Sequence, residues 1–354
     1  MAQITIIGLG TIGSSLGLAL HQYMLTPEGR TAQFTVVGYD PARDMQMAQK
    51  SGSVDRIASD LAGAVRDSAF VIIAMPTLQV REILAALGPL LPRGATVTDT
   101  APGKRLVLQW AAELLPGTVS FVGGHPLPRR VPAPAITSDE VLDEPPAADL
   151  FAGAPYCILP LANAEETAVN QVIGFAEAVG AKPYFTDPLE HDSFEAAIHD
   201  LPVLTSFALM RMLSESPAWR DMGPLAGAAF REASRMASSD PLAVRAELVA
   251  NRDNLLNWLD RYQTSLHELR ELLAATDPAD LDGAGSRDFG AALIAGRNAR
   301  TGWLNPNAAL TPAERQAKET MRQAGSGVLR SFFGGFVADR LPGNRDPEHK
   351  DHRS

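Results

Sequence analysis

Hydrophobic residues in the first half of the chain fall in short, unbroken runs with amphipathic stretches between them. The runs that predict strands are Ile4–Ile7, Phe34–Tyr39, Ala69–Met75, Thr96–Asp99 and Val119–Val122. Helical spacing follows several of them, most clearly over Thr11–Tyr23 and Leu61–Arg66. Strands without polar alternation are buried on both faces, and their alternation with helices predicts a parallel sheet that helices cover on both sides. Tyr156–Leu159 and Lys182–Phe185, which flank a helical stretch at Ala164–Val179, continue this pattern.

The pattern changes after Asp187, where strand signals stop. The predicted helices there are His191–Leu213, Pro224–Ala237, Leu242–Leu273 and Asp288–Gly302. We therefore predict an α/β fold: a Rossmann-type, doubly wound parallel sheet over residues 1–187, then an all-α substrate and dimerisation domain over 188–303. A helical extension is expected over 304–340 and a disordered polar tail over 341–354. Helical domains of this kind often bury an apolar face against a second copy, so a homodimer is expected.

Composition narrows the classes of function. The formal net charge is -10 and the pI about 5.2, which argues against a nucleic-acid partner and against an anionic membrane surface. The single cysteine, Cys157, excludes an internal disulfide and a cysteine metal cluster. We see no signal peptide and no apolar run of about 18 residues, the length that suggests a membrane span. The expectation is a cytoplasmic protein that takes a small-molecule substrate and no metal.

The strongest motif is "IIGLGTIGSSLG", in which Gly8, Gly10 and Gly13 form GxGxxG between a predicted strand and a predicted helix. Gly8 permits a tight turn, Gly10 lets a pyrophosphate approach the backbone, and Gly13 allows the helix to pack closely on the strand. The helix begins at Thr11 and Ile12, so phosphates would lie at its positive end. This context predicts a dinucleotide site.

Two further strand ends belong to the same predicted site. Asp40, at the end of "VVGYD", is placed to accept hydrogen bonds from the adenosine ribose hydroxyls, which favours NAD over NADP. Arg43 weakens that preference because it could face a 2′-phosphate, so NADP stays possible. Met75 and Pro76, at the end of "IIAMP", are expected to lie under the nicotinamide half of the cofactor.

The stretch "GGHP" places His125 directly after the predicted strand Val119–Val122. Ligands of open α/β sheets bind at the carboxyl ends of the strands, so His125 should emerge beside the redox centre. We expect the glycines to let the backbone turn sharply and Pro126 to fix its exit. A neutral imidazole held there is a general base for a substrate hydroxyl near pH 7.

The residues quoted so far, in their order, make the chain resemble prephenate and arogenate dehydrogenases. The resemblance covers about residues 3–275 and includes "SGSVDRIASDLAGAVRDSAFVIIAMP", "FVGGHPL", "LFAGAPYCILP", "DPLEHDSFEAAIHDLP" and "FREASRMASSDP". It implies oxidative decarboxylation in tyrosine biosynthesis: hydride leaves C4 of a cyclohexadiene for the nicotinamide while CO₂ departs from C1. By the same resemblance His125 takes the proton of the C4 hydroxyl, and Arg235 of the FR…R motif binds a substrate carboxylate.

The chain also departs from the family pattern. The family usually has a serine in "DxGSxK", where this chain has Pro102, which offers no hydroxyl. The family's "SHLPH" appears as His199-Asp200-Leu201-Pro202-Val203, so that Asp200 aligns with the family's first histidine. His199 can replace that histidine only with a register change, because one helical residue turns a side chain by about 100°.

These departures leave several interpretations open. Arg129 and Arg130 could supply carboxylate contacts that the altered helix has lost. The substrate could instead be arogenate, whose amine would suit Asp200, or another cyclic hydroxy acid. A third interpretation is a non-catalytic protein that only binds NAD. A β-hydroxyacid dehydrogenase is disfavoured because His191–Leu213 contains no lysine. The pair His191-Asp192 is expected to brace helices between the domains rather than take part in the chemistry.

Overall fold

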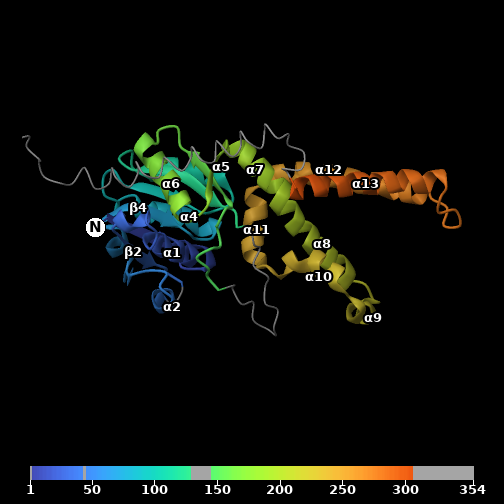
Figure 1. The fold of residues 1–354 in the computed structure, drawn as a ribbon, viewed down its shortest axis with the longest axis horizontal. Coiled ribbons are helices and arrows are strands. Elements are labelled where there is room, and N and C mark those ends of the chain that lie inside the picture. Colours follow the sequence, from blue (N-terminus) through green and yellow to red (C-terminus); the bar gives the residue numbers. More distant parts are fainter. Residues whose placement is uncertain (1, 43–44, 129–144, 306–354) are drawn as a thin grey trace, which may run out of the picture.

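The computed structural model describes residues 2–42, 45–128 and 145–305. An eight-stranded sheet with helices on both faces forms the N-terminal half, and helices alone form the C-terminal half (Figure 1). The strands are β1 (Ala2–Ile7), β2 (Phe34–Tyr39), β3 (Arg56–Ile57), β4 (Ser68–Ile73), β5 (Thr96–Asp99), β6 (Ser120–Pro126), β7 (Pro155–Pro160) and β8 (Lys182–Phe185). Their order is β3-β2-β1-β4-β5-β6-β7-β8.

Seven of these strands follow the predicted pattern, with two differences. The short edge strand β3 has only two residues and leaves no hydrophobic signal in the sequence. β7 pairs antiparallel with β6, although we expected the parallel pattern to continue. For β7 to run parallel to β6, the chain would first have to cross to the other end of the strands, where β6 begins. Here Tyr156 pairs with Pro126, so the chain re-enters the sheet at the edge where β6 left it.

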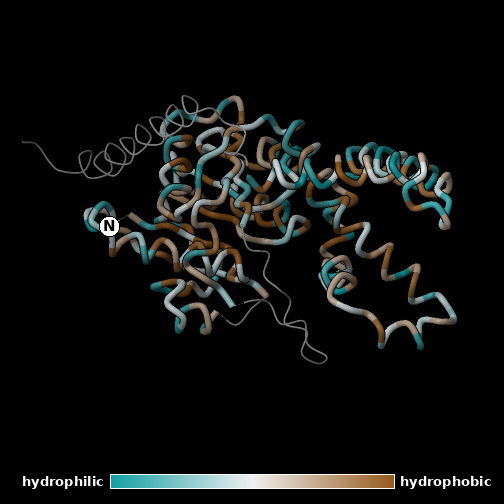
Figure 2. Tube along the Cα trace, turned by 45° about the vertical axis from the view of Figure 1, so that its right-hand side comes forward, coloured by the Kyte–Doolittle hydropathy of each residue, from teal (hydrophilic) through white to brown (hydrophobic). Residues whose placement is uncertain are grey.

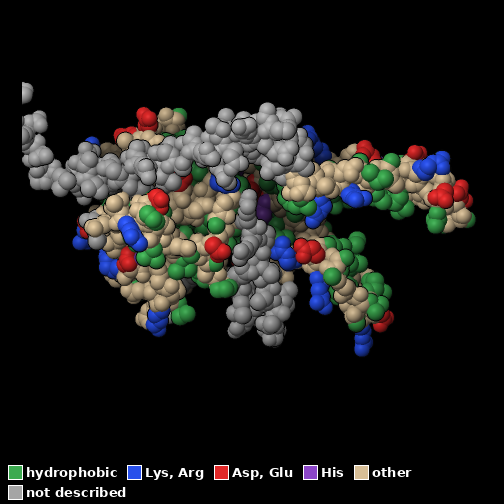
Figure 3. Space-filling model, in the orientation of Figure 1, with side chains coloured by type: hydrophobic (Ala, Val, Ile, Leu, Met, Phe, Trp, Pro, Cys, Tyr) green, Lys and Arg blue, Asp and Glu red, His purple; other side chains and the backbone are tan. Residues whose placement is uncertain are grey.

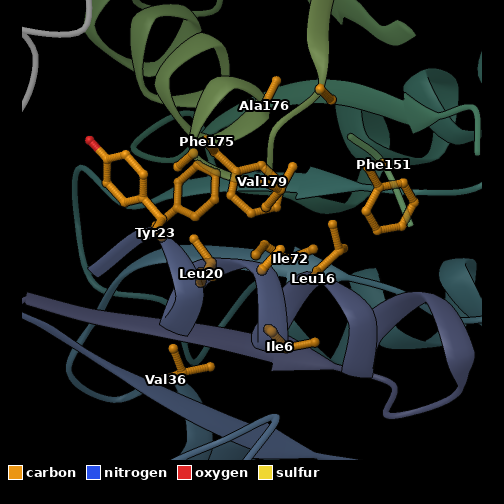
Figure 4. Packing of buried hydrophobic residues seen from close by; sticks show 14 of the residues in the cluster. Ile6, Leu16, Leu20, Tyr23, Val36, Ile72, Phe151, Phe175, Ala176 and Val179 are labelled. Carbon is orange, nitrogen blue, oxygen red and sulfur yellow. The ribbon is translucent and has the colours of Figure 1, made fainter. Parts of the chain in front are cut away.

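Two hydrophobic layers hold helices against opposite faces of the sheet. Alternate residues of one strand point to opposite faces, and Ile6 and Ile7 accordingly belong to different layers. The first layer packs α1 (Thr11–Met24) and α6 (Glu166–Ala178) on the sheet through Leu16, Leu20 and Phe175 (Figure 4). The second packs α3 (Leu61–Val65), α4 (Thr77–Leu87) and α5 (Lys104–Leu114). The short helix α2 (Met45–Lys50) follows β2. The doubly wound arrangement is confirmed.

The C-terminal half is helical, as predicted. Its helices are α7 (Pro188–Glu195), α8 (Leu201–Ser214), α9 (Trp219–Met222), α10 (Ala228–Ser234), α11 (Pro241–Ala250), α12 (Arg252–Ala274) and α13 (Ala284–Leu304). A π-helical turn, Ala196–Asp200, joins α7 to α8 without a break. α12 and α13 lie side by side as an arm that extends away from the sheet (Figure 1). The predicted helix Pro224–Ala237 is shorter, because 3₁₀ turns flank α10. The predicted extension over 304–340 and the tail lie almost entirely outside the described residues.

Apolar side chains in the helical half are largely uncovered. Among the described residues from Pro188 onward, only Ala196, Val203 and Leu255 are buried hydrophobic residues. Leu225, Leu281 and Trp303 are examples of large apolar side chains that are at least 74% exposed. Figure 2 shows apolar residues along these helices as well as in the sheet. Such surfaces mark interaction sites, in agreement with the expected homodimer.

One described helix, the continuous stretch Pro188–Ser214, is long and apolar enough to cross a membrane by length and composition. It is not the unbroken apolar run whose absence we noted in the sequence, because ionisable residues interrupt it. Its first half carries the buried polar residues His191, Asp192 and Glu195. Asp192 hydrogen-bonds the N-terminus of α5, so this part of the helix packs on the sheet domain.

Candidate active site

The glycine-rich turn after β1 is too tightly packed for side chains. Gly8 has φ +97°, and a Cβ on it would lie 2.3 Å from the carbonyl oxygen of Ala74. A Cβ on Gly13 would lie 1.9 Å from the carbonyl oxygen of Gly8. Helix α1 begins after Gly10 at Thr11 and Ile12, with no side-chain cap and no acidic residue in its first turn. The turn therefore presents a helix N-terminus that suits an anion.

The ends of β2 and β4 lie beside this turn. The Asp40 carboxylate accepts hydrogen bonds from the backbone N–H of Leu9 (2.8 Å) and of Ala42 (2.9 Å), so it is bound to the glycine-rich turn itself. Met75 is buried, and its sulfur would lie 2.7 Å from a Cβ on Gly8. Pro76 directly precedes α4. The structure thus brings Gly8, Asp40, Met75 and Pro76 together, whereas Arg43 lies outside the described residues.

His125 belongs to β6 itself, and this corrects the expectation of a sharp turn at "GGHP". The strand runs to Pro126 and pairs with β7 from Val122 to Pro126. The glycines are required for packing: a Cβ on Gly124 would lie 2.4 Å from the Tyr156 hydroxyl and 2.6 Å from the carbonyl oxygen of Asp99. Close contact with neighbouring strands, rather than a turn, therefore explains the glycine before His125.

A buried ion pair fixes the backbone beside His125. The Nζ of Lys104, at the start of α5, donates to Asp99 Oδ2 (2.6 Å) and to the carbonyl oxygen of Gly124 (2.6 Å). The Gly124 N–H donates back to Asp99 Oδ1 (3.2 Å). The side chains of Lys104 and Asp99 are fully buried. Sequence reasoning did not single out these two residues as site residues, although they are the first and last residues of the stretch that resembles "DxGSxK", Asp99 to Lys104.

The His125 ring contacts a second histidine from the helical half. Its Nδ1 lies 3.0 Å from Nε2 of His191, and Nδ1 of His191 lies 3.0 Å from Oδ1 of Asp192. Asp192 also accepts the backbone N–H groups of Lys104 (2.9 Å) and Arg105 (3.0 Å). The expected brace between the domains is thus present, and it reaches the imidazole of His125. Figure 3 shows a histidine side chain at the surface where the two halves meet.

Burial lowers the pKa of His125 well below its usual range, and His191 and Lys104 lower it further. The ring is therefore neutral near pH 7. Its Nε2 has no hydrogen-bond partner among the described residues, whereas Nδ1 faces His191. A neutral imidazole with one free ring nitrogen can accept a proton from a substrate.

The π-helical turn carries a cluster of ionisable residues next to this histidine pair. His199 Nδ1 lies 3.4 Å from Oε1 of Glu195 and 3.5 Å from Oδ1 of Asp200. The pKa of His199 is raised, first by its hydrogen bond with Asp200 and then by the charge of Glu195. The His199 side chain is 42% exposed, whereas Asp200 is buried. A π turn adds one residue to the helical repeat, and within this one His199 is partly exposed whereas Asp200 is buried.

Asp200 does not stand free for a substrate amine. Its Oδ2 accepts a hydrogen bond from Nδ2 of Asn251 (2.8 Å), and the same amide nitrogen donates to the carbonyl oxygen of Asp192 (2.8 Å). Asp200 is 3% exposed. The expected contact between Asp200 and substrate is therefore replaced by a tie between α12 and the π-helical turn, because the amide of Asn251 occupies the carboxylate.

The buried carboxyl group of Glu195 should make the stability of the fold depend on pH. Burial raises its pKa to about 7, so between pH 4.5 and 7 the folded chain keeps a proton that the unfolded chain has lost. Stability is therefore lost as the pH rises through this window, by on the order of 2–3 kcal/mol. We expect Glu195→Gln to raise the urea midpoint at pH 8 and to change it little at pH 5. The exposed Glu268→Gln is the matched control; an equal effect of Glu195→Gln at both pH values would contradict this assignment.

The three arginines predicted for substrate binding show no contact with His125 among the described residues. Arg235 is half-buried in a 3₁₀ turn that packs against α8, and it forms no ion pair with any described residue. No contact joins it to His125 within the described ranges. Arg129 and Arg130 lie outside the described residues. Sequence reasoning missed Glu195 and Asn251 as site residues; their only signal is position, since both stand next to motif residues.

Family models and relatives match both halves of the chain. The family model for the nucleotide-binding domain of prephenate dehydrogenase matches residues 25–185, and the model for its dimerization domain matches residues 187–283. Prephenate dehydrogenase of Bacillus subtilis is 28% identical over 286 residues, which are 78% of this chain and 72% of the relative. Cyclohexadienyl dehydrogenase of Zymomonas mobilis is 28% identical over 280 residues, 78% of this chain and 89% of that protein.

Solved structures share the fold. Prephenate dehydrogenase from Aquifex aeolicus, solved with hydroxyphenyl propionate and NAD⁺, superposes with a TM-score of 0.69 at 23% identity, covering 85% of this chain and 98% of that one. Arogenate dehydrogenase from Synechocystis gives a TM-score of 0.65 at 24% identity, with coverage of 85% and 99%. At these identities the likeness establishes the fold.

Proposed function

The chain belongs to the prephenate dehydrogenase family, and we propose that it catalyses the NAD-dependent oxidative decarboxylation of prephenate or arogenate in tyrosine biosynthesis. The observation that carries this function is the position of His125. The ring is buried and neutral, has one ring nitrogen free among the described residues, and lies on the strand beside β5, at the carboxyl edge of the sheet.

The residues of the glycine-rich turn fit the dinucleotide. Among the described residues, no side chain caps the N-terminus of α1 by a hydrogen bond, and the packing at Gly8 and Gly13 leaves no room for a side chain on either glycine. We infer that Gly10, Thr11 and Ile12 hold the pyrophosphate and that Asp40, whose carboxylate is bound to the backbone of the glycine-rich turn, approaches the ribose. When bound, NAD⁺ supplies the acceptor for the hydride that leaves C4 of the substrate. Met75 and Pro76 are expected beside its nicotinamide half.

His125 removes the hydroxyl proton of the substrate. Its Nε2 accepts the proton as the O–H bond breaks and C4 gives up its hydride. Loss of CO₂ from C1 then returns the electron pair of the broken C–C bond to the ring, so that the oxygen ends as the hydroxyl of an aromatic ring once it takes a proton back. Burial keeps the imidazole unprotonated beforehand, which a base requires. Arg235 and the partly exposed, readily protonated His199 are the proposed cations for substrate carboxylates. Arg129 and Arg130 remain candidates for the same role.

The substrate test compares prephenate with arogenate. NADH formation, followed by its absorbance at 340 nm, should occur with NAD⁺ and at least one of the two. Because Asp200 is occupied by Asn251, the structural reason to favour the amine of arogenate is weaker than the sequence suggested. Absence of turnover with both substrates, in protein that binds NAD⁺, would favour the alternative of a catalytically inactive NAD-binding relative.

Gly13→Ala is expected to weaken NAD⁺ binding by at least about tenfold. A Cβ 1.9 Å from the Gly8 carbonyl oxygen must displace the turn that holds the pyrophosphate. The affinity is measured by calorimetric titration with NAD⁺. Gly117→Ala is the matched control, since a Cβ there meets nothing within 4 Å and should leave the affinity unchanged. Equal affinities of the two variants would place the dinucleotide elsewhere.

We also propose an oligomeric state and a cellular location for this enzyme. The dimerization-domain match and the exposed apolar residues of the helical half support a homodimer. We propose a cytoplasmic enzyme, in agreement with its acidic composition and its single, buried cysteine.

A further inference from the structure

We propose that His191 and Asp192 act as a positioning pair that sets the tautomer of His125, and so decides which nitrogen of the catalytic ring is the base. This inference rests on the proposed function. It concerns residues whose polar atoms join the sheet domain to the helical half, 66 positions apart along the chain.

The direction of the hydrogen bonds is set at Asp192. Its carboxylate accepts two backbone N–H groups, from Lys104 and Arg105 at the N-terminus of α5. A carboxylate whose two oxygens both accept backbone N–H groups offers acceptors and no donor to its remaining neighbour. Nδ1 of His191, 3.0 Å away, must therefore carry a proton and donate it.

The same logic passes to the catalytic ring. A neutral His191 that is protonated on Nδ1 has a lone pair on Nε2 and accepts there. The neighbour within 3.0 Å is Nδ1 of His125, which must then carry the proton. His125 is left with its lone pair on Nε2, the nitrogen that has no partner among the described residues. The chain of bonds thus holds His125 in the tautomer that can accept a substrate proton.

The His125 ring of this chain lacks one neighbour that the family pattern provides. The family position for a serine beside the catalytic histidine is Pro102, which has no hydroxyl and no N–H. Within the described residues, His191 is the hydrogen-bond partner of the His125 ring. A buried ring with a single hydrogen bond depends on that bond for both its orientation and its tautomer.

Asp192→Asn tests the direction of the chain. An asparagine amide can donate to Nδ1 of His191, which moves the proton of His191 to Nε2 and the proton of His125 to its own Nε2, where it blocks the base. Long-range ¹H–¹⁵N spectra of histidine-labelled protein report the tautomer, with His125→Asn identifying the resonances. We expect Nδ1–H in the wild type and Nε2–H in Asp192→Asn. We also expect kcat to fall at least about 100-fold with NAD⁺ affinity unchanged, as for a triad whose orienting acid is neutralised.

His191 provides a second test that does not disturb α5. His191→Gln keeps an acceptor for the N–H of His125 and should lower kcat by about tenfold, whereas His191→Leu removes the acceptor and should lower it by about 100-fold. The exposed His267→Asn is the matched control. A His191→Leu variant within threefold of the wild-type kcat, or a His125 proton on Nε2 in the wild type, would overturn the inference. If the wild type converts neither substrate, the proposed function fails, and the tautomer of His125 still decides this inference.

Discussion

His125→Asn is expected to lower kcat by about 10³-fold, within the range that removal of a general base costs in enzymes. The imidazole Nε2 is the proton acceptor that the structure places at the carboxyl edge of the sheet, and burial keeps it neutral. Asparagine can donate to Nε2 of His191 through its amide and so preserve the hydrogen bond at this position, but it cannot take up a proton. The loss should therefore appear in kcat.

The control measurement is the affinity for NAD⁺, determined by titration. His125 lies on β6, whereas the glycine-rich turn follows β1, so the affinity should stay within about twofold of the wild type. A His125→Asn enzyme with substantial turnover would move the base to another residue. Glu195, which is buried, lies next to the histidine pair and has a pKa of about 7, would then be the first candidate.

Lys104→Met is expected to lower the free energy of unfolding by about 3–5 kcal/mol, the usual cost of leaving one member of a buried ion pair without its partner. Methionine has a similar length but cannot donate to Asp99 or to the carbonyl oxygen of Gly124. The Asp99 carboxylate would keep the backbone N–H groups of Ala101 and Gly124, and it would carry a buried charge without a cation. Urea unfolding of the full chain measures the loss.

The double variant Asp99→Asn with Lys104→Met separates charge from packing. Its neutral amide oxygen can still accept a backbone N–H, so we expect the double variant to recover part of the stability that Lys104→Met loses. Lys182→Met is the matched control, since Lys182 is exposed on β8 and should change the free energy by less than about 0.5 kcal/mol. If the double variant is less stable than Lys104→Met, the loss comes from packing of the lysine stem.

The sequence predicted the sheet domain well because buried parallel strands are unbroken apolar runs, and these can be counted directly. The direction of a strand relative to its neighbour could not be predicted in the same way. Whether β7 runs parallel or antiparallel to β6 depends on the edge at which the chain re-enters the sheet, and no residue of Tyr156–Leu159 encodes that edge. The two-residue strand β3 is too short for any periodicity to reveal it.

The site was predicted in its chemistry and missed in its connections. The dinucleotide motif and His125 were found because glycine spacing and a histidine at a strand end are local patterns. The contact between His125 and His191 joins residues 66 positions apart, so only the tertiary structure reveals it. The exposure of His199 and the burial of Asp200 could not be predicted, because no pattern in the sequence reveals the π-helical turn that carries both residues.

The uncovered helical half has a consequence for the catalytic ring. His191 lies on α7, which continues without a break into helices whose apolar faces the described residues leave bare. A second subunit that covers those faces adds to the free energy that keeps α7 in place, and mass action makes this contribution rise with protein concentration. Dilution of the protein should therefore lower the turnover rate at concentrations that leave the affinity for the dinucleotide unchanged. The residues of the proposed cofactor site belong to the sheet domain, which has its own hydrophobic core.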